Sequence, residues 1–157
     1  VAITRDLWFV DTTVKIYTNA VALDLGDSTA GAFKLALFQD SITPDASQAD
    51  PAYGSSPFNA GEVSGTGYST GGLALTSVVF EEHPSSPGTI RWDFDNVSWS
   101  ASTIPSAKGA LIYAPGLANR AILLRTFGQE YSSQDGTFSI NLHTDGIAKL
   151  GLLGPAS

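Results

Sequence analysis

The sequence predicts an all-β protein, either an antiparallel β-sandwich or a Greek-key barrel of about seven to nine strands, with one short helix near the N-terminus. Three observations predict this class. Apolar and polar residues alternate in several short segments. The 16 glycines and 8 prolines suit short strands joined by turns. Turn residues recur about every ten to fifteen residues in a chain of 157, which is long enough to bury a core.

The N-terminal part, residues 1–30, is predicted to be an arm with a short helix or strand that makes assembly contacts. It begins with the apolar run Leu7-Trp8-Phe9-Val10, which would be a liability if it were exposed. We therefore expect this run to pack on the domain or on a neighbouring subunit. Residues 31–157 are predicted to form the β-sandwich domain.

A short helix is the preferred prediction for residues 11–26. Asp11-Thr12-Thr13 could cap such a helix, and Gly26 could end it. The alternation of Val21, Leu23 and Leu25 fits a strand instead, so both alternatives stay open at this point.

Strands are predicted from Phe33 onward. Phe33, Leu35 and Leu37 alternate with Lys34 and Ala36. Residues 40–60 then form a loop with three prolines, and a loop of this length in a compact domain is usually functional or an assembly contact. Three apolar residues of the loop are candidate contacts: Ile42, Tyr53 and Phe58.

The middle of the chain gives the clearest strand signals. Residues 73–80 form a predicted strand that is apolar on both faces. Residues 89–95 alternate cleanly, with Ile90, Trp92 and Phe94 on one face. The apolar parity then changes, so that Val97 and Trp99 follow a bulge or a tight bend. Further strands are predicted within residues 110–113, 120–127, 137–142 and 146–153.

The segment Gly61–Leu75 contains five glycines and resembles a phosphate-binding loop at first sight. The spacing of Gly65, Gly67 and Gly71 is Gly-x-Gly-x-x-x-Gly, however, and a strand follows where a dinucleotide site needs a helix. A structural role in turns and bulges is therefore the better interpretation. We predict no cofactor and no metal site.

Other candidate chemistry is sparse. The two histidines, His83 and His143, have no local ligand spacing for zinc. Asp93 and Asp95 lie on one face of a predicted strand and could serve a hydrolase together with His143, but a solvated strand face is the more common reason for such a pair. Calcium is conceivable at the loop carboxylates, although the usual calcium-loop motif is absent.

Charge and composition exclude several partners. The net charge is −7, and eight scattered Lys and Arg residues do not supply the basic surface that nucleic acid requires. No stretch approaches about eighteen consecutive apolar residues, so we expect a soluble protein without membrane partners. There is no cysteine, which leaves stability to packing or assembly.

An ordered set of short motifs resembles a group of small structural proteins in the virions of tailed bacteriophages. It comprises Ala32–Phe38, a loop rich in Pro, Asp and Ala, Gly61–Tyr68 with Gly71–Leu75, Trp92–Trp99, Gly109–Tyr113 with Asn119-Arg120-Ala121, and Phe127-Gly128 with Gly136–Ile140. The resemblance covers roughly residues 30–150. It implies a non-enzymatic β-domain that is built into a phage particle.

Within that group, we expect a capsid decoration (cement) protein on the outer face of the head. Its expected partners are the major capsid protein and copies of itself, as a trimer or a similar oligomer. The residues predicted to make the assembly contacts are Leu7, Trp8, Phe9, Val10, Ile42, Tyr53 and Phe58. The alternative is a tail, baseplate or fibre-associated module that binds host glycans, with stacking surfaces among Trp99, Tyr53, Tyr68 and Tyr131.

Overall fold

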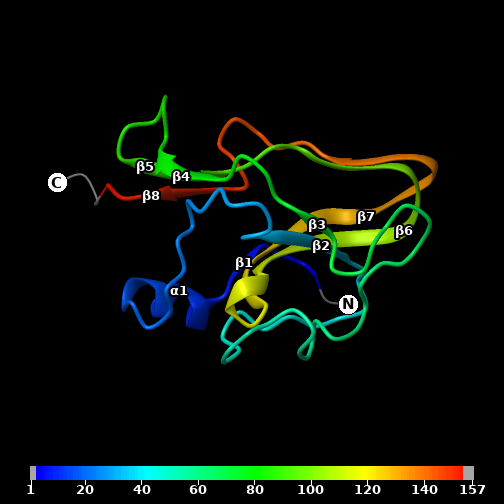
Figure 1. Ribbon diagram of the computed structural model, residues 1–157, viewed down its shortest axis with the longest axis horizontal. Helices are drawn as coiled ribbons and strands as arrows, with labels where there is room; N and C mark the ends of the chain where they lie inside the picture. Colours follow the sequence, from blue (N-terminus) through cyan, green and yellow to red (C-terminus); the bar gives the residue numbers. More distant parts are fainter. Residues whose placement is uncertain (1–2, 154–157) are drawn as a thin grey trace.

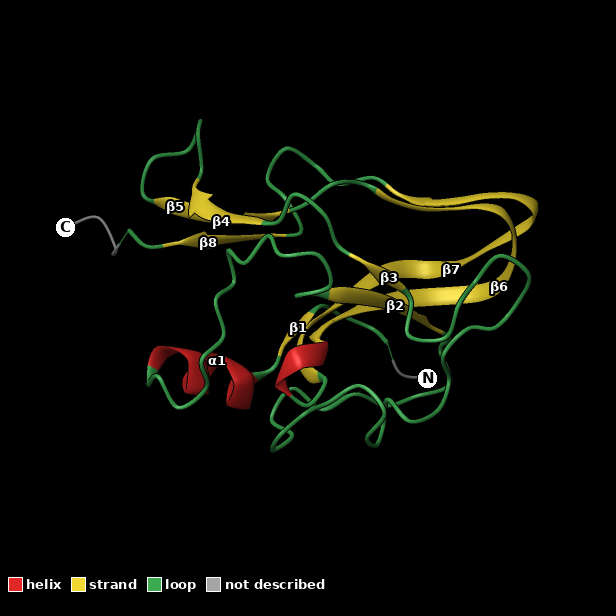
Figure 2. Cartoon of the chain, in the orientation of Figure 1, coloured by secondary structure: helices red, strands yellow, loops and turns green. Residues whose placement is uncertain are grey.

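The computed structural model of the protein describes residues 3–153 and contains two antiparallel sheets and one short α-helix (Figures 1 and 2). The larger sheet has the strand order β1-β7-β6-β2-β3, and the smaller one has the order β4-β5-β8. The predicted all-β class is confirmed, as is the short helix. The outer bounds predicted for the two segments, residues 1 and 157, lie outside the described residues.

The elements follow the chain in a simple order. They are β1 (Leu7–Trp8), α1 (Val10–Tyr17), β2 (Lys34–Phe38), β3 (Leu73–Ala74), β4 (Val79–Glu82), β5 (Thr89–Asp93), β6 (Val97–Ala114), the 3-10 helix η1 (Pro115–Leu117), β7 (Arg120–Ile140) and β8 (Ala148–Gly151). The helix was the preferred prediction for residues 11–26; residues 21–25, the alternative strand, form no regular element.

The strands β6 and β7 form a long hairpin that connects the two layers. They pair from Val97 with Ile140 to Ala114 with Arg120. Figure 1 shows this two-stranded ribbon curving around one end of the molecule, so that its two halves lie one above the other. Register shifts between Trp99 and Gly109 accompany the curve, because bulges bend a strand.

The sequence predicted only the ends of these two strands. Residues 100–108 and 128–136 are rich in Ser, Gly and other small or polar residues and lack regular alternation. They form strand because each strand supplies hydrogen-bond partners to the other around the bend. Pairing between two segments far apart in the sequence cannot be deduced from the residues of either one.

One predicted strand, residues 73–80, is wrong as a single element. It is divided into β3, which pairs with β2 in the larger sheet, and β4, which pairs with β5 in the smaller sheet. Ser77 lies between them with φ of 55°, a backbone conformation that interrupts a strand. The change of sheet explains why the segment is apolar on both faces.

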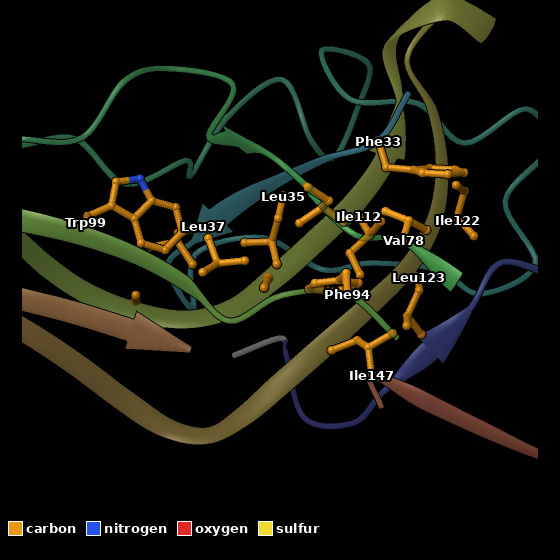
Figure 3. Packing of buried hydrophobic residues seen from close by; sticks show 14 of the residues in the cluster. Phe33, Leu35, Leu37, Val78, Phe94, Trp99, Ile112, Ile122, Leu123 and Ile147 are labelled. Carbon is orange, nitrogen blue, oxygen red and sulfur yellow. The ribbon is translucent and has the colours of Figure 1, made fainter. Parts of the chain in front are cut away.

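The core lies on both faces of β2. Phe33, Leu35 and Leu37 point between the sheets, where they join Trp92 and Phe94 in the main cluster (Figure 3). Two residues of β2, Ala36 and Phe38, belong to a second cluster on the opposite face. The parity change predicted after Asp95 marks the point where the chain leaves the smaller sheet and enters β6.

Residues 7–9 of the N-terminal segment are part of the sheet and the core. Leu7 and Trp8 pair with Leu124 and Leu123 of β7, and Phe9 is fully buried. An apolar run of this kind is stabilised by the nearest apolar surface, which here belongs to the same chain. Within residues 3–153, no helix is long and apolar enough to cross a membrane.

Candidate functional site

The seven predicted contact residues have very different environments. Phe9, Ile42 and Phe58 are buried in the second core cluster, so their side chains are not available to a partner in this conformation. Leu7, Trp8 and Tyr53 are partly buried. Val10 is the exception, with 51% of its surface exposed. The sequence identified these residues as apolar but could not show that the loop of residues 40–60 folds back on its own domain.

Tyr53 belongs to a hydrogen-bonded cluster centred on Glu62. The Tyr53 and Tyr68 hydroxyls each donate to the Glu62 carboxylate at 2.7 Å, and the Gly71 backbone N–H donates to it at the same distance. Tyr113 stacks on Tyr53 with ring centroids 4.5 Å apart and donates to the Gly71 carbonyl. These hydrogen bonds therefore hold both ends of the glycine segment against the sheet.

Burial controls the tyrosine pKa values in this cluster. Burial, with a smaller contribution from the nearby Glu62 carboxylate, raises the pKa of Tyr113 to about 12. The pKa values of Tyr53 and Tyr68 are also raised, first by burial and then by their hydrogen bonds to Glu62, although the Leu37 N–H partly offsets this for Tyr68. All three hydroxyls therefore stay protonated at neutral pH and act as donors.

The glycine segment itself lies against strand backbones. A Cβ atom on Gly65 would overlap the carbonyl oxygen of Thr103, and one on Gly72 would overlap that of Leu35. The Thr103 N–H donates to the Thr66 carbonyl at 2.9 Å. The glycines are thus explained by close backbone approach, as the sequence predicted for a structural segment.

A groove that the sequence did not predict lies between α1 and the smaller sheet. Its volume is about 290 Å³. The lining comes from three distant parts of the chain and is almost entirely carbon: Trp8, Thr13, Ile16, Tyr17, Leu25, Phe80, Ile90, Trp92, Ala148 and Leu150. Among the predicted contact residues, Trp8 alone lines it. A hint was present in the sequence, since Ile90 and Trp92 share a strand face, but only the fold brings α1 beside it.

The groove offers little to a polar ligand. The Thr13 hydroxyl donates to the Phe9 carbonyl, and the Trp92 indole N–H donates to the Leu25 carbonyl, both at 2.9 Å. The Trp8 and Trp92 rings lie 5.7 Å apart and form one wall. With these donors already paired, the groove is suited to apolar side chains, because burying a polar group there without a partner would be unfavourable.

Most of the large exposed apolar side chains lie in or next to elements that line the groove, and two of them, Tyr17 and Leu150, belong to its lining. Of the large apolar residues that are exposed in residues 3–153, six of seven belong to α1 or to residues 150–153. The seven are Val10, Val14, Tyr17, Tyr131, Leu150, Leu152 and Leu153. Figure 1 shows α1 and β8 at the same end of the molecule. An apolar concentration of this kind on a folded domain is typical of an interaction surface.

The structure brings His83 and His143 to the same carboxylate. The buried His83 has Nε2 2.9 Å from Asp145 Oδ1, and the exposed His143 has Nδ1 3.4 Å from Asp145 Oδ2. Ser85 Oγ lies 3.4 Å from His83 Nδ1, which gives the residue types of a hydrolase triad. The Ser85 backbone N–H already donates to that nitrogen at 3.2 Å, so it is not free to accept the hydroxyl proton.

The other candidate chemistry has structural partners. Asp95 accepts hydrogen bonds from Thr76 and Ser77, which lower its pKa, and Asp93 pairs with Arg91. Among the described residues, neither aspartate forms a hydrogen bond or an ion pair with His143, which pairs with Asp145. Within residues 3–153, no group of three or more His, Cys, Asp or Glu side chains is placed to hold a metal ion.

The proposed glycan-stacking surfaces are mostly unavailable. Trp99 is 3% exposed and packs between Tyr68 and Phe138, so it is a core residue and not a stacking platform. Its indole nitrogen is buried without a hydrogen-bond partner. Tyr53 and Tyr68 are bound to Glu62, which leaves Tyr131, with 47% of its surface exposed.

No family model, no curated protein and no solved structure matches this chain.

Proposed function

We propose that this protein is a non-enzymatic structural component of a tailed-phage virion, most simply a decoration protein on the outer capsid surface that bridges and stabilises major capsid subunits. The proposal combines the sequence resemblance with the surface of the fold. The observation that carries it is the apolar groove between α1 and the smaller sheet, together with the exposed apolar residues around it.

The groove provides a physical basis for a shell contact. An apolar side chain of a capsid subunit would fit between Trp8, Trp92 and Leu150, and each buried large apolar side chain would contribute about 1.5–3 kcal/mol. The surrounding apolar residues would enlarge the contact. A net charge of −7 supports an outer location, because a protein inside the head would meet packaged DNA.

The copy number in purified virions tests the location. Gel densitometry should show this chain at capsid stoichiometry if it decorates the head. A few copies per particle would instead favour the alternative, a tail, baseplate or fibre-associated module. Absence from virions would contradict the proposal altogether.

A pair of surface substitutions tests the groove. Tyr17→Asp combined with Leu150→Asp places two charges at its rim and should abolish binding to undecorated particles, because a carboxylate cannot be buried there unpaired. Tyr131→Asp makes the same change at an exposed tyrosine outside the groove and is the control. Unchanged occupancy of particles by the folded double variant would rule out this contact.

Deletion of the N-terminal residues is less informative than these substitutions. Removing residues 1–10 would take away the buried Phe9 ring and the pairing of β1 with β7. Loss of particle binding would then report unfolding as readily as a lost contact. The surface variants avoid this ambiguity, and thermal melting followed by circular dichroism would verify that they are folded.

A further inference from the structure

The outer edge of β7 is open over most of its length. On that side, β1 pairs only with Leu123 and Leu124. Among residues 3–153, no backbone group outside β6 hydrogen-bonds to the backbone of residues 127–140. Gly128 to Ser132 are all exposed. A long edge of this kind presents unpaired N–H and C=O groups that can pair with another chain.

A hollow lies directly beside this edge. Its volume is about 420 Å³. Its lining comes from β7 and the residue that follows it: Phe127, Tyr131, Ser132, Thr137, Phe138, Ser139, Ile140 and Asn141. The Phe127 ring packs against those of Tyr131 and Phe138, at centroid distances of 6.3 Å each. The curve of the ribbon therefore combines an open backbone edge with a recess that has aromatic and hydroxyl groups.

The charges along this edge of β7 indicate which kind of protein segment could bind there. Between residues 126 and 140 the chain carries Glu130 and Asp135 and has no Lys or Arg. Lys108 of β6 donates to the Gly128 carbonyl, and Asp135 accepts from the Thr103 hydroxyl. Within residues 3–153, Glu130 has no hydrogen bond or ion pair. A second copy paired antiparallel through β7 would bring like charges together, which destabilises a strand pair.

We propose that residues 127–140 of β7 accept an extended segment of another protein by β-strand addition, and that this segment carries Lys or Arg. The added strand would form main-chain hydrogen bonds with β7. Because side chains alternate along a strand, every second one would point toward the hollow beside Tyr131 while the basic ones face Glu130. This surface is distinct from the groove, and the inference does not depend on the virion assignment.

Fluorescence anisotropy with a labelled peptide tests the proposal on the full chain. The probe is Lys-Val-Lys-Val-Lys-Val-Lys, compared with the same sequence carrying Glu in place of Lys, and with the Lys peptide N-methylated at every residue. We expect saturable binding of the first peptide only, because the second has the wrong charge and the third cannot donate main-chain hydrogen bonds. Amide hydrogen exchange should slow in residues 127–140.

Charge reversal at two exposed glutamates, one on the β7 edge and one elsewhere, provides a test variant and its control. Glu130→Lys should weaken binding of the Lys peptide about 3- to 10-fold, whereas Glu82→Lys, an exposed glutamate on the edge strand β4, should leave it unchanged. Thr137→Trp should weaken binding by filling the hollow while the edge stays open, because Thr137 is an exposed residue of its lining.

Several results would overturn the proposal. They are no saturable binding at millimolar peptide, equal binding of the N-methylated peptide, equal weakening by Glu82→Lys, or slowed exchange at β4 with none at β7. Glycan-array binding that is lost in Tyr131→Ala, without any peptide binding, would assign the hollow to carbohydrate instead.

Discussion

The two strands of the curved ribbon have outer edges of opposite character. The edge of β6 is covered: β2 pairs with residues 109–113, and the glycine segment lies against residues 101–103. The edge of β7 is paired with β1 at Leu123 and Leu124 and bonded to Phe9 and Pro51 at Ile122 and Ala121, whereas among the described residues it is open from residue 127 to residue 140. On the β6 edge the loop approaches the strand so closely at Gly65 and Gly67 that a Cβ atom would meet the backbone of residues 101–103. Two of the glycines in the segment are therefore explained by the edge that it covers.

The covered edge also has a polar anchor that the open edge lacks. Glu62 accepts hydrogen bonds from Tyr53, Tyr68 and the Gly71 N–H, and this holds the glycine segment at both ends. On the open edge, hydroxyl groups of Ser132 and Ser133 turn inward and accept from backbone N–H groups of β6. They stabilise the bulged ribbon but leave its outer side free.

The largest expected effect is that of a glycine in the segment that covers the β6 edge, Gly72, which itself lies against β2. Gly72→Ala should destabilise the fold by at least about 3 kcal/mol, because the new Cβ would overlap the Leu35 carbonyl at a positive φ. Gly128→Ala on the open edge is the control: its φ of 77° is similar to the 71° of Gly72, but nothing lies within 4 Å. It should cost about 1–2 kcal/mol. Urea unfolding monitored by tryptophan fluorescence measures both, and equal losses would contradict the close contact.

Removing the anchor should have the next largest effect. Glu62→Ala leaves two tyrosine hydroxyls and one N–H without their acceptor and should cost about 2–4 kcal/mol. Glu81→Ala removes an exposed carboxylate that pairs with Arg91 and should cost less than about 1 kcal/mol. If the two variants had the same urea midpoint, Glu62 would not be an anchor.

Alkaline pH should loosen the covered edge. The folded-state pKa values of Tyr53, Tyr68 and Tyr113 lie above the ordinary value of 10.0, so their contribution to stability is fully present below about pH 10 and is lost as pH rises through the folded-state values, beginning near 12 for Tyr113. Ultraviolet absorbance of tyrosinate should therefore show a late phase that coincides with unfolding. In Glu62→Ala that phase should move to lower pH.

The open edge should be the least sensitive to substitution. Glu130→Lys should change the free energy of unfolding by no more than about 0.5 kcal/mol, because the side chain is exposed and has no partner to lose. A loss of several kcal/mol in the same urea experiment would show that the edge contributes to the fold, and would remove the contrast between the two strands.

The sequence was most informative where the residue pattern of a single segment is sufficient to predict its structure. The alternation of Ile90, Trp92 and Phe94 predicted β5, and the glycine spacing predicted a structural segment of the kind that Gly65 and Gly72 form by close backbone approach. The sequence was least informative where two distant segments meet. The strand predicted for residues 73–80 is two strands in different sheets, and the middle of the ribbon was not predicted at all.

For the candidate site, the sequence determined which residues are apolar, and only the tertiary structure decided which of them remain exposed. Phe9, Ile42 and Phe58 were equal candidates with Val10, but the fold buries the first three. The groove combines Trp8, Ile90 and Leu150 from three separate segments. The physical reason is that the hydrophobic effect has no direction and acts on any apolar side chain alike. Whether a given side chain is buried by its own chain or remains available to a partner depends on the arrangement of strands around it.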